Sequence, residues 1–106
     1  MKSLSSGLLP HMAFNILLAL SVGPRHGYAL MQHIREDSAG QLAVGPGALY
    51  SSLKQLCERH FIEELPFAGD DPRRRYYRLT KKGFDRLAAD LPYYRHVVAA
   101  AKQRHL

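Results

Sequence analysis

The sequence predicts one mainly α-helical domain with a small β-hairpin and a long C-terminal helix. Two amphipathic stretches, residues 27–38 and 45–59, show the three-four spacing of helices and are joined by a short connection. Two short stretches rich in β-formers follow, residues 61–65 and 75–79, with turn residues between them. Two helices followed by a hairpin are typical of a winged helix-turn-helix.

The composition favours a polyanionic partner. The chain has 106 residues, enough for one small core, and 46% of them are apolar, which excludes wholesale disorder. The formal charge is +6, and six cations without an acid lie between residues 73 and 82. They are Arg73, Arg74, Arg75, Arg78, Lys81 and Lys82. A cluster this dense is either a solvated face or a phosphate-binding surface, so nucleic acid is the first candidate partner and an anionic membrane surface the second.

The sequence indicates a cytoplasmic protein without a membrane segment. The apolar run over residues 12–22 is interrupted by Asn15 and is too short to span a bilayer, and no signal peptide is visible. Cys57 is the only cysteine, so no intramolecular disulfide can form. Its place on an apolar helical stripe favours a buried structural role over a redox role.

The helix predicted from Gly45 to Arg59 has two dissimilar faces. Its narrow apolar stripe consists of Leu49, Leu53, Leu56 and Cys57. The other face carries small, hydroxyl and amide side chains and one lysine, which can reach a phosphate or a base edge without blocking the approach. Pro46 suits the first helical position, and the glycines on either side leave bare backbone N–H groups that attract anions.

The two preceding helices supply much of the predicted core. The first, beginning at Pro10, has Met12, Ile16, Leu17 and Leu20 on one side and Phe14, Leu18 and Val22 on another. A helix that is apolar on both sides must be covered on both, and in so short a chain a second subunit can supply one cover. The second helix runs from about Gly27 to Ser38, and Gly40 can close it in the left-handed conformation.

The last predicted helix begins after Thr80, a capping residue. It continues with the coiled-coil-like repeat Phe84, Leu87, Leu91, Tyr94, Val98 and Ala101. Pro92 interrupts the repeat, which predicts either a bend near Leu91 or two helical pieces. The part beyond Pro92 has no partner left inside so small a domain, so we expect it to pack against a second copy of the chain and not to fray.

We therefore expect residues 1–83 to form the winged helix-turn-helix and residues 84–106 a C-terminal dimerisation helix, within one compact domain. The predicted dimer interface consists of Phe14, Leu18, Leu91, Tyr94 and Val98. Tyr93 and Tyr94 are a candidate effector pocket between subunits, although a plain dimer contact is the favoured role for them.

The sequence offers no catalytic, metal or cofactor site. The six histidines lack the close spacing of a zinc site, and no acid, histidine and serine follow in an order that suggests nucleophilic catalysis. A Gly-rich phosphate loop is also missing. We therefore expect neither an enzyme nor a cofactor, and we expect His26 to form a local hydrogen bond at the start of the second helix.

Three separated motifs carry a family resemblance. They are His26-Gly27-Tyr28, then Gly47-Ala48-Leu49-Tyr50, and then Tyr76-Tyr77-Arg78-Leu79-Thr80-Lys81-Lys82-Gly83. In this order they resemble the PadR-like family of bacterial transcriptional regulators, over roughly residues 9–90. The resemblance implies a winged-helix homodimer that binds a near-palindromic DNA operator, usually as a repressor released by a small hydrophobic or aromatic effector. It also implies that the helix at Pro46 enters the major groove, while the hairpin reaches the flanking backbone or minor groove.

The resemblance assigns DNA contact to particular positions. Tyr50 and the helix N-terminus around Gly47 match positions that face DNA in the family, and Arg74 and Arg75 match the basic pair before the paired tyrosines. The predicted DNA-binding residues are Gly47, Ala48, Tyr50, Ser51, Lys54, Arg73, Arg74 and Arg75. In the alternative interpretation, Tyr50 is an edge residue of the core, and Ser51 and Lys54 are merely solvated.

Three positions depart from the family pattern. Ala48 stands where serine or threonine is usual, and Gly45 where a capping hydroxyl is common. His60 replaces a usual glycine between the recognition helix and the hairpin, so a left-handed backbone there would be strained. With one C-terminal helix, the chain looks like the small branch of the family, in which an effector pocket lies at the dimer centre.

Two other functions stay open at this point. The first is a winged helix used for protein–protein contact, with only non-specific affinity for DNA, and weak sequence-blind binding would favour it. The second is an enzyme, for which the sequence offers no catalytic constellation.

Overall fold

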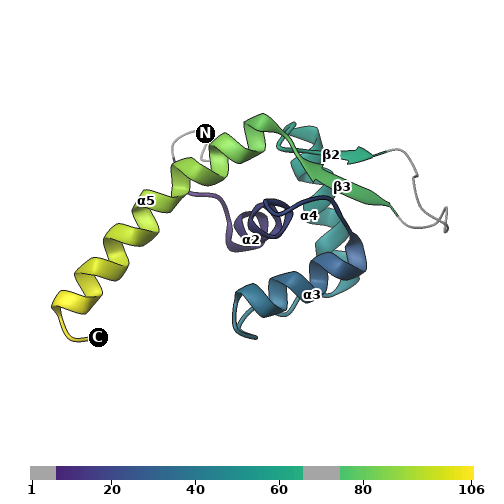
Figure 1. Ribbon diagram of the computed structural model, residues 1–106. Coiled ribbons are helices and arrows are strands. Elements are labelled where there is room, and N and C mark those ends of the chain that lie inside the picture. Colours follow the sequence, from purple (N-terminus) through teal and green to yellow (C-terminus); the bar gives the residue numbers. More distant parts are fainter. Residues whose placement is uncertain (1–6, 66–74) are drawn as a thin grey trace.

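The computed structural model describes residues 7–65 and 75–106, and Figure 1 shows the arrangement of their helices and strands. The elements are α2 (His11–Leu20), β1 (Arg25–His26), α3 (Gly27–Asp37), α4 (Pro46–Glu58), β2 (Ile62–Leu65), β3 (Tyr76–Leu79) and α5 (Lys81–Gln103). The strands form an antiparallel sheet in the order β1-β3-β2. The predicted helices and hairpin are therefore present, in the order of a winged helix-turn-helix.

Strand β1 is the element that the sequence analysis did not predict. It has only two residues, and its Arg25 and His26 lie opposite Tyr77 and Tyr76 of β3. A two-residue strand has no measurable alternation, so only its pairing with β3 reveals it. This pairing attaches the start of α3 directly to the hairpin.

Helix α2 lies at the centre of the molecule, between α5 on one side and α3 and α4 on the other (Figure 1). Its Ile16 and Leu17 are fully buried, and the helix contacts α3, α4 and α5. The buried apolar core consists of Leu9, Ile16, Leu17, Ala19, Leu20, Leu30, Ile34, Leu49, Leu53, Leu56, Phe61, Ile62, Tyr77 and Leu87. Phe14 and Leu18, predicted for the second apolar side of α2, are only partly buried.

The helix ends follow local backbone chemistry. Pro46 occupies the start of α4 with Gly45 as its N-cap, as predicted, and Gly40 after α3 is left-handed with φ +79°. Ala39 is also left-handed, which the sequence did not suggest. His60 has φ +64°, as expected at a position where the family carries glycine, and such a backbone costs a non-glycine residue about 1–2 kcal/mol.

Helix α5 begins at Lys81, where Thr80 accepts a hydrogen bond from the Gly83 N–H at 3.0 Å. It is one continuous helix through Pro92, so the predicted break into two pieces is wrong (Figure 1). Pro92 and Ala88 are both exposed, so water can bind the Ala88 carbonyl that has no N–H partner at Pro92. The boundary predicted after residue 83 falls inside the first turn of this helix.

The first half of α5 is fixed to the rest of the domain by polar and aromatic contacts. The buried Asp90 carboxylate accepts a hydrogen bond from the Leu9 N–H at 2.9 Å and lies 3.3 Å from Arg86 Nε. Phe14 of α2 packs on Tyr94 with ring centroids 4.9 Å apart. Beyond Tyr94 the helix extends away from the body of the molecule (Figure 1).

Candidate nucleic-acid interface

Helix α4 presents one polar face to solvent. Leu49, Leu53 and Leu56 are buried against α2 and α3, which fixes the rotation of α4 about its axis. The opposite face therefore points outward, and its exposed residues include Gly47, Ala48, Tyr50, Ser51 and Lys54. All five predicted α4 contacts thus lie on accessible surface, as recognition of a base edge or a phosphate requires.

The N-terminus of α4 is open to an anion. Gly45 forms no side-chain cap, and Pro46 and Gly47 add no polar side chain of their own. A Cβ added at Gly45 or Gly47 would meet nothing within 4 Å, so the backbone there can approach another molecule closely. The N–H groups of the first turn and the helix dipole both favour negative charge at this point.

Tyr50 joins the two N-terminal sequence motifs in space. Its side chain is 45% exposed, and its hydroxyl lies where a Cβ on Gly27 would be. Its ring atom Cζ would be 2.8 Å from that Cβ, so only glycine at position 27 lets Tyr50 lie against the start of α3. Tyr50 is therefore both an exposed residue of α4 and an edge residue of the α3–α4 contact, which combines the two interpretations of its sequence position.

Two aromatic residues flank Gly27, and the sequence analysis gave neither of them a place on the surface. Tyr28, in the first turn of α3, is 64% exposed. His26 accepts a hydrogen bond from the Ala29 N–H at 3.3 Å, as expected for a local role, and its ring also packs edge-on against Tyr76 at 5.3 Å. The exposure of Tyr28 has no signal in the sequence, because helical spacing alone leaves its orientation open.

The described cations of the basic cluster all have partners. Arg78 is bound to Glu63, and Arg75 lies 3.8 Å from Glu64. Lys81 lies 3.0 Å from Asp85, and Lys82 donates to the Arg59 carbonyl at 3.0 Å while its Nζ lies 5.2 Å from the centre of the Phe61 ring. The absence of acids between residues 73 and 82 was thus misleading, because β2 places its glutamates opposite β3.

These surface ion pairs do not prevent the cations from binding phosphate. Exposed pairs of this kind contribute about 0–1 kcal/mol each, so a phosphate can replace the glutamate at little cost. Arg73 and Arg74, predicted contacts on the hairpin, lie outside the described residues. Arg75 is exposed and remains the described residue of that predicted trio.

Comparison with known proteins places this fold in a family. The model of a protein family described as "Transcriptional regulator PadR-like family" matches residues 16–89, which is more than half of the chain. The chain belongs to the PadR-like family of transcriptional regulators. The resemblance inferred from the three motifs is thus confirmed, and the chain is a winged-helix domain of a DNA-binding transcriptional regulator and not an enzyme.

Solved structures support the fold along nearly the whole chain. A PadR family transcription regulator from Clostridium difficile is 22% identical, with a TM-score of 0.78 over 92% of this chain and 100% of that one. The complex structure of hsRosR-S1 is 31% identical, with a TM-score of 0.69 over 92% of this chain and 83% of that one. RosR of H. salinarum is 25% identical, with a TM-score of 0.67 over 92% and 96% of the two chains.

One curated relative is much longer than this chain. An uncharacterised 37.1 kDa protein of a Streptomyces fradiae transposon is 38% identical over 68 residues. The match covers 64% of this chain but only 18% of the length of that relative. This relative indicates neither a partner nor an activity.

The described residues of the chain contain neither a metal site nor a membrane-spanning helix. In residues 7–65 and 75–106, no group of three or more His, Cys, Asp and Glu side chains could hold a metal ion. Among these same residues, no helix is both long and apolar enough to cross a lipid bilayer. Cys57 is partly buried, and burial is the main cause that raises the pKa of its thiol, which suits a structural role.

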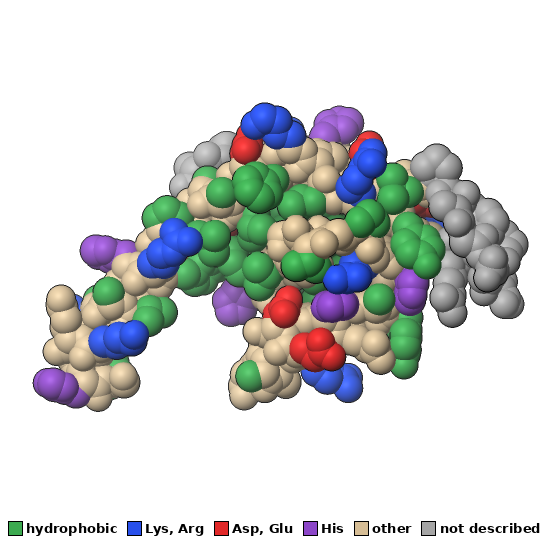
Figure 2. Space-filling view, viewed as in Figure 1, with side chains coloured by type: hydrophobic (Ala, Val, Ile, Leu, Met, Phe, Trp, Pro, Cys, Tyr) green, Lys and Arg blue, Asp and Glu red, His purple; other side chains and the backbone are tan. Residues whose placement is uncertain are grey.

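Of the residues predicted for the dimer interface, Leu91, Tyr94 and Val98 lie on α5, and Phe14 and Leu18 lie on α2. Tyr93 and Val98 are 50% and 52% exposed, and Val97 is exposed as well. Leu91 and Tyr94 are partly buried, since Tyr94 packs on Phe14 of its own chain and on Tyr93 at 5.3 Å. Figure 2 shows hydrophobic side chains at the surface where α2 and α5 meet. No second chain is present, so the interface stays a prediction.

Proposed function

We propose that this PadR-like chain binds a near-palindromic DNA operator as a homodimer and represses transcription until a small hydrophobic or aromatic effector releases it. The observation that carries the proposal is the exposed face of α4, because its opposite face is fixed in the core by Leu49, Leu53 and Leu56. An α-helix fits the major groove of B-DNA, and a helix whose rotation is fixed by the core presents the same side chains to the DNA each time it binds.

The proposed division of labour follows from the side-chain chemistry. In this proposal the exposed Ser51 and Lys54 reach base edges, and the bare N-terminus of α4 accepts a phosphate. Arg73, Arg74 and Arg75 would contact the flanking backbone from the hairpin. Phosphate contacts supply affinity that falls with salt, whereas contacts with base edges supply the preference for one sequence.

The homodimer is supported by the exposed apolar side chains of α5. Tyr93, Val97 and Val98 follow one another along a helix that leaves the body of the domain, and solvent exposure of so many apolar groups is unfavourable. The same helix of a second copy, together with the partly buried Phe14 and Leu18 of α2, would cover them. Two-fold symmetry would then place the two α4 helices about one or two DNA turns apart.

The effector and the repressor role rest on the family resemblance. Tyr93 and Tyr94 form an edge-on aromatic pair at the proposed dimer centre, where an aromatic effector could pack. An effector acts by binding one dimer spacing better than another, and this difference in affinity limits how far it can shift the population. A regulator of this kind would work in the cytoplasm of a bacterium, where the DNA is.

The proposal is tested by selecting a bound duplex from a random DNA pool and measuring binding to it and to an unrelated duplex by fluorescence anisotropy. We expect Lys54→Ala and Ser51→Ala to reduce the ratio of the two affinities, because each removes a group that reads the sequence. Arg75→Ala should weaken both affinities alike. Arg104→Ala, at the exposed end of α5, is the matched control and should change neither.

The alternative function is a protein–protein interaction module with only non-specific affinity for DNA. It would be supported if the two duplexes bound equally well and neither α4 variant changed the ratio. The proposal would then fail even though the fold remained a winged helix.

A further inference from the structure

Arg25 stands apart from the other arginines of the sheet region. Arg75, Arg78 and Arg86 each have a carboxylate partner, on Glu64, Glu63 and Asp90. Arg25 has no ion pair or side-chain hydrogen bond within residues 7–65 and 75–106. Its Nε is nevertheless buried from solvent. Partial burial of a charged group without a carboxylate partner is costly, so an anion that bound the accessible end of this guanidinium would relieve the cost.

The backbone fixes where this guanidinium lies. Arg25 belongs to β1 and pairs with the buried Tyr77 of β3, so its side chain leaves the sheet on the side of the core, next to α2 and α3. This position is separate from the exposed face of α4. It is also separate from the aromatic pair Tyr93 and Tyr94 of α5.

Arg25 lines an open pocket at the surface. Its apolar wall consists of Leu18, Ala19 and Val22 at the end of α2, and α3 contributes His33 and Asp37. His33 is half-buried and supplies a second nitrogen, whereas Asp37 is exposed at the rim and forms no ion pair with Arg25. The pocket thus offers one permanent cation, one imidazole and an apolar surface, with a carboxylate at its edge.

We propose that this pocket binds a small organic carboxylate with an aliphatic body. The carboxylate accepts hydrogen bonds from the terminal guanidinium nitrogens of Arg25, and the body packs on Leu18, Ala19 and Val22. A single negative charge suits the site better than a dianionic phosphate, because only one permanent cation is present and Asp37 repels further negative charge. The bound molecule would touch α2, β1 and α3 together, and the proposal does not depend on DNA binding.

The test uses the full chain and two probes of the same shape. 4-Methylpentanoate carries the carboxylate, and 4-methylpentanamide replaces it with a neutral amide. Both are titrated at constant ionic strength and followed by ¹⁵N–¹H chemical shifts of the protein. We expect the acid to shift signals of residues 18–25 and 33–37 and to bind at least about tenfold more tightly than the amide, since hydrogen bonds between two charged groups are stronger than those to a neutral amide.

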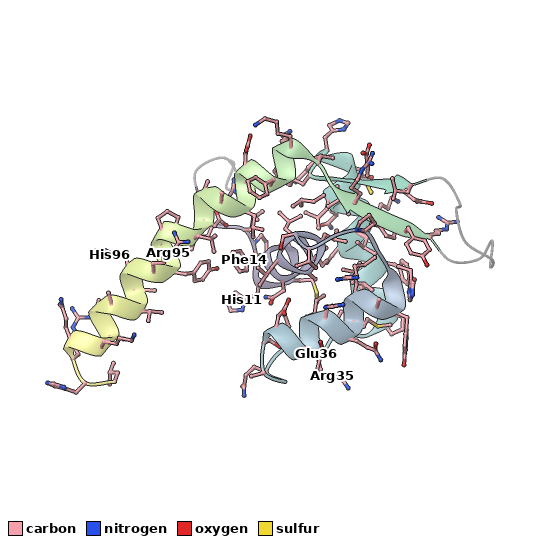
Figure 3. All side chains as sticks on the ribbon, viewed as in Figure 1. His11, Phe14, Arg35, Glu36, Arg95 and His96 are labelled. Atoms are coloured by element: carbon pink, nitrogen blue, oxygen red, sulfur yellow. The ribbon has the colours of Figure 1, made fainter. Side chains whose placement is uncertain are left out.

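The variants assign this preference to one side chain. Arg25→Met should fold normally, because Nε has no partner to lose, and should bind acid and amide alike. Arg25→Lys keeps the charge without the planar fork and should retain only part of the preference, which gives a second measurement if the methionine variant does not fold. Arg35→Met is the matched control: Figure 3 shows Arg35 on α3, and its exposed side chain does not line the pocket.

Three results would overturn the proposal. They are equal binding of acid and amide to the wild-type chain, acid-induced shifts that lie outside residues 18–25 and 33–37, and an acid preference that is as large in Arg25→Met or in Arg25→Lys as in the wild type. Inorganic phosphate serves as a further probe, and binding as tight as that of the acid would contradict the assignment to a monocarboxylate. None of these results bears on operator binding, so failure here and failure of the proposed function are distinguishable.

Discussion

Gly83→Ala is expected to destabilise the chain although alanine is the better helix former. Gly83 lies in the first turn of α5, where the helical preference alone would favour alanine by about 0.5–1 kcal/mol. A Cβ there would overlap the Phe61 carbonyl oxygen and lie 2.9 Å from its carbon and 2.8 Å from Leu79 Cδ1. The Phe61 carbonyl also accepts the Thr80 N–H at 3.1 Å, so the backbone cannot move away without losing this bond.

The expected net loss is about 0.5–4 kcal/mol. Overpacking costs about 1–3 kcal/mol and the weakened hydrogen bond about 0.5–1.5 kcal/mol, from which the gain in helical preference is subtracted. For a domain of this size, a loss of 1 kcal/mol lowers Tm by roughly 4–8 °C. The assay is thermal unfolding followed by circular dichroism at one fixed protein concentration, because dimerisation would make Tm depend on concentration.

Gly47→Ala is the control for this measurement. Gly47 also lies in a first helical turn, but a Cβ there meets nothing within 4 Å. This variant should therefore be as stable as the wild type or up to about 1 kcal/mol more stable. If Gly83→Ala unfolded at or above the wild-type Tm, the close contact between α5 and the hairpin would be wrong.

Three further predictions concern assembly, DNA and pH. Val98→Asp should dissociate the dimer in sedimentation experiments, because it places a charge in the proposed interface, whereas Val98→Ala should not; a stable dimer of the aspartate variant would place the interface elsewhere. Arg75→Ala should make the negative slope of log K against log salt less steep by about 0.9, the value for one phosphate contact. An unchanged slope would show that Arg75 does not contact a phosphate. Burial, followed by the Glu64 carboxylate, raises the pKa of the Tyr77 phenol. The folded chain therefore holds this proton more tightly, and stability present below about pH 10 is lost as the pH rises further, as measured by urea unfolding. Tyr77→Phe should reduce this alkaline loss, and an equal loss in both proteins would contradict the assignment to Tyr77.

The sequence predicts the helices and the hairpin because their signals are local. The stripe of Leu49, Leu53 and Leu56 gives both the existence of α4 and its buried face, and Thr80 marks the start of α5. Tyr77 is buried and Tyr76 is only partly so, as the alternation of side chains along a strand requires. The family adds the role of these elements, which their periodicity does not contain.

Other features depend on contacts between distant residues. Neither the Glu63–Arg78 pair nor the contact of Tyr50 with Gly27 follows from spacing along the chain, because each joins two separate elements. The continuity of α5 through Pro92 depends on solvent around the Ala88 carbonyl, which the proline rule alone does not consider. The pocket at Arg25 is absent from the sequence analysis because β1 has only two residues.

The central claim is that the exposed face of α4 reads a DNA sequence in a two-fold symmetric dimer. The most direct measurement is selection of bound duplexes from a random DNA pool by the full chain at near-physiological salt. We predict the recovery of one inverted repeat, with half-site centres one or two helical turns apart. Recovery of no common sequence, with binding that disappears as salt rises, would contradict the claim and leave only non-specific attraction by the basic cluster.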